Sequence, residues 1–289
     1  MIRFLELLRI KHWVKNGFVL MPLVFGGMLG NYRDVMRAME VFGIFCLLSS
    51  GIYVMNDISD LKADKVHPIK KHRPLAEGEI GIKTALFILT SLLGISLFLG
   101  YMMGAKVFVV VLLYLMLNVL YDLVLKKIII LDVISVALGF ELRVWGGAVA
   151  LNIVPTVWLQ LCVFLLALFL GFIKRRHEKI VLCDKAIEHR EVLMHYTPYF
   201  LDQVISISAT LVTLFYALYV VSPDVVTNSA HRRMAYTIPF VIYGIFRYLY
   251  LVYAKELGGD PSDILTSDLP FALNLLLWVF SAGVILYIL

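Results

Sequence analysis

Four side chains that could hold a metal ion fall within the segment N-D-I-S-D-L-K-A-D, residues 56–64. An α-helix turns by about 100° per residue, so Asn56, Asp57, Asp60 and Asp64 would share one face if the helix continued to the next proline. Carboxylates on one face repel unless a cation lies between them. Oxygen ligands suit Mg²⁺, which commonly bridges carboxylates to substrate phosphates, with Mn²⁺ as an alternative. We therefore expect the three aspartates to be metal ligands, with Asn56 as a supporting ligand.

Cations follow this segment directly in K-K-H-R-P, residues 70–74. A diphosphate bound to one Mg²⁺ is still anionic, so Lys70 and Arg73 are expected to bind it beside the metal. The alternative is a solvated helix end, in which the lysines at 62–65 and the basic run only neutralise the aspartates.

A second polar cluster lies in residues 121–143, which begin at Tyr121 and surround a short turn between two apolar runs. Asp122 and Lys126 are four residues apart in the order that favours an ion pair within a helix, so a purely structural pair is one interpretation. Asp132 and Arg143 lie at or inside an apolar segment, where ionisable groups are costly and usually face a cavity or a partner.

The elements that would position these residues are membrane helices. Of the 289 residues, 61% are hydrophobic and 16% are charged, and the mean hydropathy is +0.88. This composition excludes a soluble domain, and it predicts an all-α membrane protein with one domain over residues 1–289. Runs of roughly 20 apolar residues predict nine spans, at 14–31, 35–55, 83–103, 106–122, 128–149, 156–173, 203–221, 236–254 and 269–289.

The basic residues are distributed as a topology signal. Most Lys and Arg fall in the N-terminal segment and in the loops 56–83, 123–127 and 174–190. The positive-inside rule then predicts a cytoplasmic N-terminus and a polar cavity that faces the cytoplasm of the cell inner membrane. This distribution also argues against nucleic acid as a partner, despite a pI of about 9.0. The three cysteines are too scattered for a disulfide framework or a zinc site.

Taken together, these motifs resemble those of the UbiA-type intramembrane prenyltransferase superfamily. Within it, the chain is most similar to the branch of decaprenyl-phosphate phosphoribosyltransferases. The motifs that carry the resemblance are W-V-K-N at 13–16, N-D-I-S-D-L-K-A-D-K-V-H-P at 56–68, K-K-H-R-P at 70–74, Tyr121 with Lys126 and Asp132, L-R-V-W-G-G at 142–147, K-R-R-H-E at 174–178, F-R-Y at 246–248 and G-D-P-S-D-I-L at 259–265. The chain departs from the family's usual pattern at Asp122, Glu141 and Arg176–His177.

The resemblance implies a UbiA-like helical bundle and a reaction. Members of this branch transfer 5-phosphoribose from phosphoribosyl diphosphate (PRPP) to a polyprenyl phosphate with Mg²⁺, and the lipid product supplies arabinose for cell-wall polymers. On this basis we expect Lys126 and Asp132 to be catalytic residues together with Asp57, Asp60 and Asp64. Substrate contacts are expected from Lys15, Asn56, Lys70, Arg73, Tyr121, Arg143, Lys174 and Arg175. An oligomer is compatible with the sequence.

Three other functions are alternatives. A prenyltransferase that moves a prenyl group from a prenyl diphosphate to an aromatic acceptor would share the fold, the metal and the first motif. An ion-coupled transporter would place its acidic residues near the bilayer midplane, whereas most acids here lie at span ends. A CDP-alcohol phosphotransferase would carry D-G-x-x-A-R, which this sequence lacks.

Overall fold

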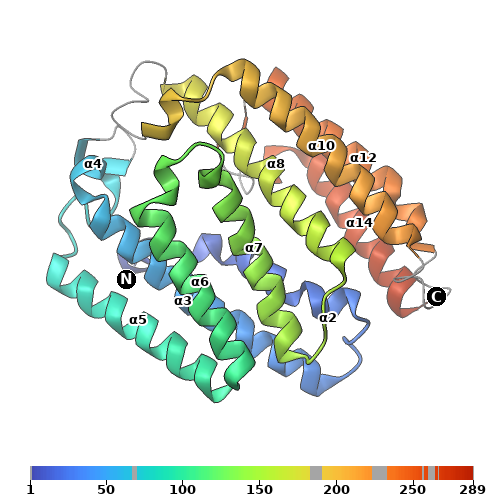
Figure 1. Ribbon diagram of the computed structural model, residues 1–289, viewed down its shortest axis with the longest axis horizontal. Coiled ribbons are helices and arrows are strands. Elements are labelled where there is room, and N and C mark those ends of the chain that lie inside the picture. The colour runs from blue at the N-terminus through green and yellow to red at the C-terminus, as the bar shows by residue number, and fades with distance from the viewer. Residues whose placement is uncertain are drawn as a thin grey trace. The chain divides into compact units, whose positions relative to one another are not determined.

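The computed structural model describes residues 2–66, 70–182, 191–222, 233–255, 257–259, 264–265 and 267–288, and every regular element within them is a helix (Figure 1). By its contacts the chain forms two compact units. Unit 1 comprises residues 1–126 and 139–155, and unit 2 comprises residues 127–138 and 156–289.

Within the described residues, eight helical segments are long and apolar enough to cross a membrane. They are Tyr32–Ser59, Ile82–Met102, Ala105–Leu123, Leu131–Ala150, Val157–Val181, Pro198–Val221, Met234–Ala254 and Leu269–Tyr287. These segments overlap eight of the nine predicted spans.

The predicted span at 14–31 is folded differently. It consists of the 3₁₀ helix η1 (Ile10–Leu20) followed by the short helix α2 (Met21–Phe25). Pro22, in the first turn of α2, has no backbone N–H to donate to a preceding turn. After α2 the chain turns at Gly27, whose φ of +69° is readily adopted only by glycine. These two residues break the apolar run into short pieces.

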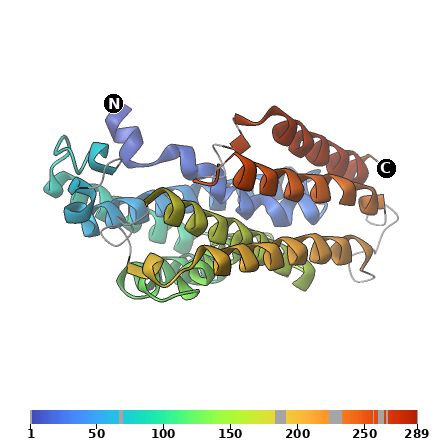
Figure 2. The same ribbon diagram turned by 90° about the horizontal axis from the view of Figure 1, so that it is seen from above.

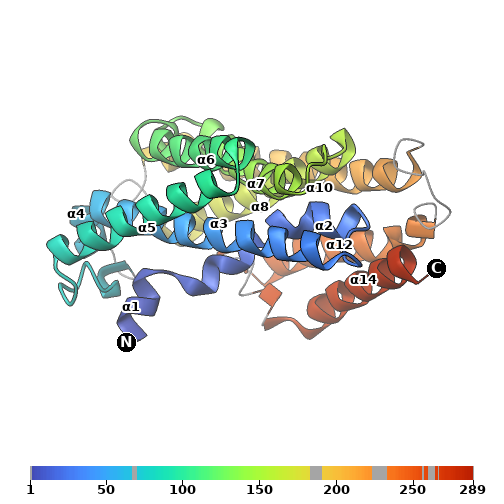
Figure 3. The ribbon, with the colours of Figure 1, turned by 90° about the horizontal axis from the view of Figure 1, so that it is seen from below.

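Unit 1 is built around the long helix α3 (Tyr32–Ser59), whose N-terminus is capped by the Asn31 side chain. The helix α5 (Ile82–Met102) packs along α3 (Figure 3), and α6 (Ala105–Leu123) packs against both. The core is formed by buried residues of α3 and α6, including Phe45, Leu48 and Val111, together with Val19 of η1. Further elements of unit 1 are α1 (Ile2–Leu7), α4 (Leu61–Val66) and η2 (Lys70–His72).

The helix α7 (Leu131–Ala150) contributes its second half to unit 1. A Cβ atom at Gly147 would overlap the carbonyl oxygen of Val19, and one at Gly146 would overlap the ring of Phe45. The paired glycines of the L-R-V-W-G-G motif therefore allow η1 and α3 to approach α7 closely.

Unit 2 consists mainly of long helices. They are α8 (Val157–Leu182), α10 (Pro198–Val221), α12 (Ile238–Ala254) and α14 (Leu269–Tyr287). The helices α8 and α10 pack side by side, as do α12 and α14 (Figure 2). Buried residues such as Phe169, Leu201 and Tyr248 form one core among them. Short 3₁₀ helices, η5 (Glu191–Met194) and η6 (Met234–Thr237), precede α10 and α12.

Candidate active site

The aspartate segment does not form one continuous helix. The helix α3 ends at Ser59, and Asp60 is its C-cap with φ −91° and ψ 7°. The chain then restarts as α4, so Asp64 belongs to a second, short helix. The expectation of a single helix up to Pro68 is therefore wrong, and Pro68 itself lies outside the described residues. Because of this break, Asp57 and Asp64 share one partner, whereas Asp60 has a different one.

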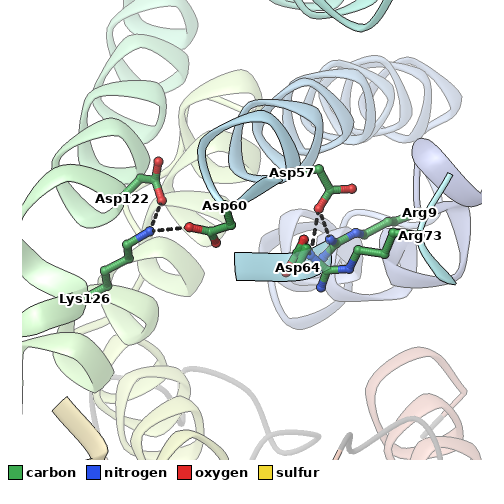
Figure 4. A network of polar contacts seen from close by, with 7 residues as sticks. All are labelled: Arg9, Asp57, Asp60, Asp64, Arg73, Asp122 and Lys126. Atoms are coloured by element: carbon green, nitrogen blue, oxygen red, sulfur yellow. Dashed lines mark hydrogen bonds and ion pairs between the residues drawn. The ribbon is translucent and has the colours of Figure 1, made fainter. Parts of the chain in front are cut away.

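Asp57 and Asp64 share one cation, as Figure 4 shows. The Nη1 atom of Arg73 lies 2.9 Å from Oδ1 of Asp57 and 2.6 Å from Oδ2 of Asp64. Both carboxylates are about 3% exposed. A second guanidinium, that of Arg9, donates to the same Oδ1 atom of Asp57. The two buried carboxylates are thus neutralised by two arginines from distant parts of the chain, as buried charges require.

Asp60 turns the other way and meets Lys126, which is part of the 3₁₀ helix η3 (Leu125–Lys127) (Figure 4). The Nζ atom of Lys126 lies 3.0 Å from Asp60 and 2.6 Å from Asp122. Burial alone would lower the pKa of Lys126, but the hydrogen bonds to Asp122 and Asp60 raise that pKa above its ordinary value. The ammonium group is therefore charged at neutral pH, and it joins the first and second polar motifs. The predicted ion pair of Asp122 with Lys126 is present as well, but it spans the end of α6 at Leu123 and does not lie within one helix.

The residues fit Mg²⁺ by their chemistry. The donor set is all oxygen, as a hard divalent ion prefers. The Oδ1 atom of Asn56 is buried and has no hydrogen-bond partner among the residues that the structure describes, so a lone pair in this segment is left for a ligand. Within the described residues, no group of three or more His, Cys, Asp or Glu side chains has the arrangement of a metal site. The carboxylates of the three aspartates are instead paired with Arg9, Arg73 and Lys126.

Asp132 has a buried site of its own in unit 2. It is fully buried in the first turn of α7. Its Oδ2 atom accepts from Nε of Arg175 at 2.6 Å, and its Oδ1 atom accepts from the hydroxyl of Tyr196 at 2.7 Å. The same hydroxyl accepts from the backbone N–H of Ile130 at 2.8 Å. Burial and the hydrogen bond to Asp132 raise the pKa of Tyr196, so this hydroxyl stays a donor.

Ile130 has a φ of +70°, in the left-handed region. A β-branched residue adopts this conformation only under strain. The bond from its N–H to Tyr196 fixes the turn that leads into Asp132.

Arg143 lies in a buried network of unit 1. Its Nε donates to Asn16 of η1 at 2.8 Å, its Nη1 to the carbonyl of Gly139 at 2.9 Å, and its Nη2 to the hydroxyl of Tyr114 at 2.6 Å. Asn16 in turn donates to Ser49 of α3. Arg143 thus ties η1, which carries Lys15, to α6 and α7.

A comparison with known families decides what kind of protein this is. The model of the UbiA prenyltransferase family matches residues 19–265. The chain belongs to this family. Decaprenyl-phosphate phosphoribosyltransferase of Corynebacterium glutamicum is 32% identical over 98% of this chain and 86% of that protein. The protein of the same name from Mycolicibacterium smegmatis is 30% identical over 98% of this chain and 92% of its own length.

The solved structures agree on the fold. A UbiA homolog from Archaeoglobus fulgidus, bound to GPP and Mg²⁺, matches with a TM-score of 0.73 and 18% sequence identity over 98% of this chain and 99% of that chain. The protein is therefore a multi-pass membrane transferase with the UbiA fold.

The remaining predicted residues of this UbiA-family chain are distributed over both units. In unit 1, Lys15 and Tyr121 are half-buried on η1 and α6, and Lys70 begins η2. In unit 2, Lys174 is half-buried on α8 beside the buried Arg175. Arg175 also pairs with Glu178 one turn later, at 2.7 Å. The G-D-P-S-D-I-L motif, including Asp260 and Asp263, lies largely outside the described residues.

Two residues that bond the predicted aspartates, Arg9 and Tyr196, were not predicted from the sequence. Arg9 stands in a basic N-terminal segment, where a positive charge is expected for topology alone. It lies 48 residues before Asp57, and Tyr196 lies 64 residues after Asp132. No local spacing links either pair. W-V-K-N at 13–16 is the only nearby motif that marks the Arg9 segment.

Proposed function

We propose that this transferase moves 5-phosphoribose from PRPP to a polyprenyl phosphate of the decaprenyl type and releases diphosphate, with Mg²⁺ as cofactor. The proposal is carried by the similarity to two relatives whose names give decaprenyl phosphate as the substrate and phosphoribosyl as the transferred group, and this similarity extends over 98% of the chain. The cluster of Asp57, Asp64 and Arg73 is consistent with it, because it combines carboxylates for a metal with a cation for a diphosphate.

The donor would be held by the first motif. Asp57, Asp60 and Asp64 would hold the metal, with Asn56 supplying its buried oxygen atom. When bound, Mg²⁺ neutralises charge on the departing diphosphate. Arg73 would then hold diphosphate oxygens that the metal does not contact, together with Lys70 and Tyr121 at the diphosphate or the ribose.

The acceptor requires little proton chemistry. Loss of diphosphate from C1 of the ribose leaves an oxocarbenium-like carbon, and a lipid phosphate is already anionic at pH 7. No general base is therefore needed, and the role of Lys126 is to hold an anionic oxygen once Asp60 binds the metal. Lys15 and Lys174 would bind the donor 5-phosphate or the acceptor phosphate. Asp132 would act by holding Arg175 in place, and Arg143 by fixing η1.

We also propose that the whole chain acts as one transferase domain. Its N-terminus and its active site would face the cytoplasm at the inner membrane. The lipid tail of the acceptor would lie in a groove between helices, and this groove would be open to the bilayer.

The test uses purified protein in nanodiscs and two labelled donors. PRPP with decaprenyl phosphate is expected to give labelled lipid in the presence of Mg²⁺, and a prenyl diphosphate with 4-hydroxybenzoate is expected to give no product. Product in the second reaction alone would replace the proposal by the aromatic prenyltransferase alternative. Asp60→Asn is expected to abolish the first reaction. Asp34→Asn, at the opposite end of α3, is the matched control and should leave it unchanged.

A further inference from the structure

We propose that Arg9 is a binding residue for the diphosphate, and that it exchanges Asp57 for the diphosphate when a divalent cation binds the carboxylates. This inference rests on the metal-diphosphate part of the proposed function and is independent of the sugar. Within the described residues, Arg9 is one of two arginines in contact with Asp57, and it comes from a different segment than Arg73.

The backbone holds Arg9 in an unusual conformation at this place. Arg9 is the N-cap of η1 and has φ 50° and ψ 47°, in the left-handed region. Such strain in a residue other than glycine is found preferentially at functional sites. Ser50 of α3 fixes the chain on both sides of Arg9, because it donates to the carbonyl of Leu8 at 2.8 Å and accepts from the indole N–H of Trp13 at 3.0 Å.

The charges of the cluster explain why a second arginine matters. Asp57 and Asp64 carry two negative charges, which Arg9 and Arg73 cancel. If a divalent ion takes these carboxylates, both guanidinium groups lose their partners beside a surplus of two positive charges. An anion with several oxygens then satisfies them, and a diphosphate provides such oxygens.

The side chain of Arg9 is also placed for this exchange. Its guanidinium lies over the ring of Tyr53, with Cζ 4.8 Å from the ring centroid. This cation–π contact keeps the group in position after its carboxylate partner is lost. The Arg9 side chain is 21% exposed whereas that of Asp57 is 3% exposed, so a ligand can reach Arg9 from the solvent side.

The experiment measures binding rather than turnover. Isothermal titration of the full-length protein in nanodiscs gives the affinity for Mn²⁺ alone, and then for inorganic diphosphate at saturating Mn²⁺. The variants are Arg9→Gln, which removes the charge, and Arg9→Lys, which keeps it. Arg3→Gln is the matched control, because Arg3 lies in the same N-terminal segment and pairs with the exposed Glu6 and with Glu79.

For Arg9→Gln, the affinity for diphosphate is expected to fall about tenfold or more, as the loss of a charged hydrogen bond implies. The affinity for Mn²⁺ alone should stay the same or rise, because a competitor for Asp57 is gone. Arg9→Lys retains a point charge without the planar fork, so it should lose about threefold. Arg3→Gln should match the wild type in both titrations.

Unchanged diphosphate binding in Arg9→Gln, with the wild type binding normally, would overturn the role of Arg9 and leave the proposed function intact. If Arg9→Gln does not fold, wild-type diphosphate affinity in Arg9→Lys would overturn it equally. A wild-type protein that binds no diphosphate at saturating Mn²⁺ would overturn both. If the binding results hold but PRPP is not a substrate, only the sugar assignment fails.

Discussion

Replacing Arg73 by glutamine is expected to destabilise the protein by about 3 kcal/mol in the absence of metal. Arg73 bonds Asp57 at 2.9 Å and Asp64 at 2.6 Å, and these carboxylates are 3% and 4% exposed. Removing one partner from a buried ion pair costs about 3–5 kcal/mol. The Arg73 side chain is 26% exposed, so water reaches part of the vacated space and the lower end applies.

The loss can be traced to the uncompensated charge with a second substitution. In the double variant Arg73→Gln/Asp64→Asn, the buried charge left behind is removed, so about 1–2 kcal/mol of the loss should be recovered. Reversible unfolding in mixed detergent–SDS micelles with EDTA measures the free energy of unfolding of each variant. Addition of Mg²⁺ should stabilise Arg73→Gln more than the wild type, because a divalent ion replaces the missing charge.

The control for this experiment is Lys71→Gln. Lys71 is exposed and lies two residues before Arg73, so its replacement should change the free energy of unfolding by no more than about 0.5 kcal/mol. If Arg73→Gln were as stable as Lys71→Gln in EDTA, Arg73 would not be neutralising the buried carboxylates. If Asp64→Asn made the Arg73→Gln variant still less stable, the loss would not come from an uncompensated charge.

Three further predictions concern other parts of the molecule. Tyr196→Phe should cost about 2–3 kcal/mol in the same unfolding assay, because a buried carboxylate loses a donor and the N–H of Ile130 loses its acceptor. Gly147→Ala should cost about 1–3 kcal/mol, since its Cβ would overlap the carbonyl of Val19, whereas Gly94→Ala on α5 meets open space and should be neutral or stabilising by up to about 1 kcal/mol. EDTA should abolish lipid labelling from PRPP, and added Mg²⁺ should restore it.

Each of these has an outcome that contradicts it. A Phe variant as stable as the wild type would mean that the Tyr196 hydroxyl does not support the buried aspartate. Equal effects of the two glycine substitutions would remove the argument for close helix approach at Gly147. Labelling that persists in EDTA, with a metal-free buffer as control, would exclude a role for Mg²⁺ in the reaction.

Hydropathy was sufficient to predict most of the fold. Eight of the predicted spans coincide with long helices because the bilayer length and the apolar composition decide where such helices form. The segment 14–31 is the exception, since average hydropathy does not register the effect of Pro22 or of the positive φ at Gly27. Local backbone chemistry determined the structure there.

The candidate site was predictable in its residue types and less so in its pairing. Helical spacing identified the aspartates of 56–64 as candidate metal ligands. It did not predict their partners, because the helix breaks at Asp60, which pairs with Lys126, whereas Asp57 and Asp64 pair with arginines. Periodicity cannot reveal such a break when no proline or glycine marks it. Contacts between residues far apart in the sequence, such as that of Arg9 with Asp57, are set by packing alone.

The position of Arg9 also bears on how the chain is inserted into a membrane. Asp57 stands in the last turn of a long apolar helix, where a lone carboxylate opposes insertion. One of its two counter-charges lies 48 residues earlier and the other 16 residues later. When α3 emerges from the ribosome, Arg9 has therefore already been synthesised, whereas Arg73 has not. Arg9 can thus neutralise the charge of Asp57 while α3 is being inserted, before Arg73 has been synthesised.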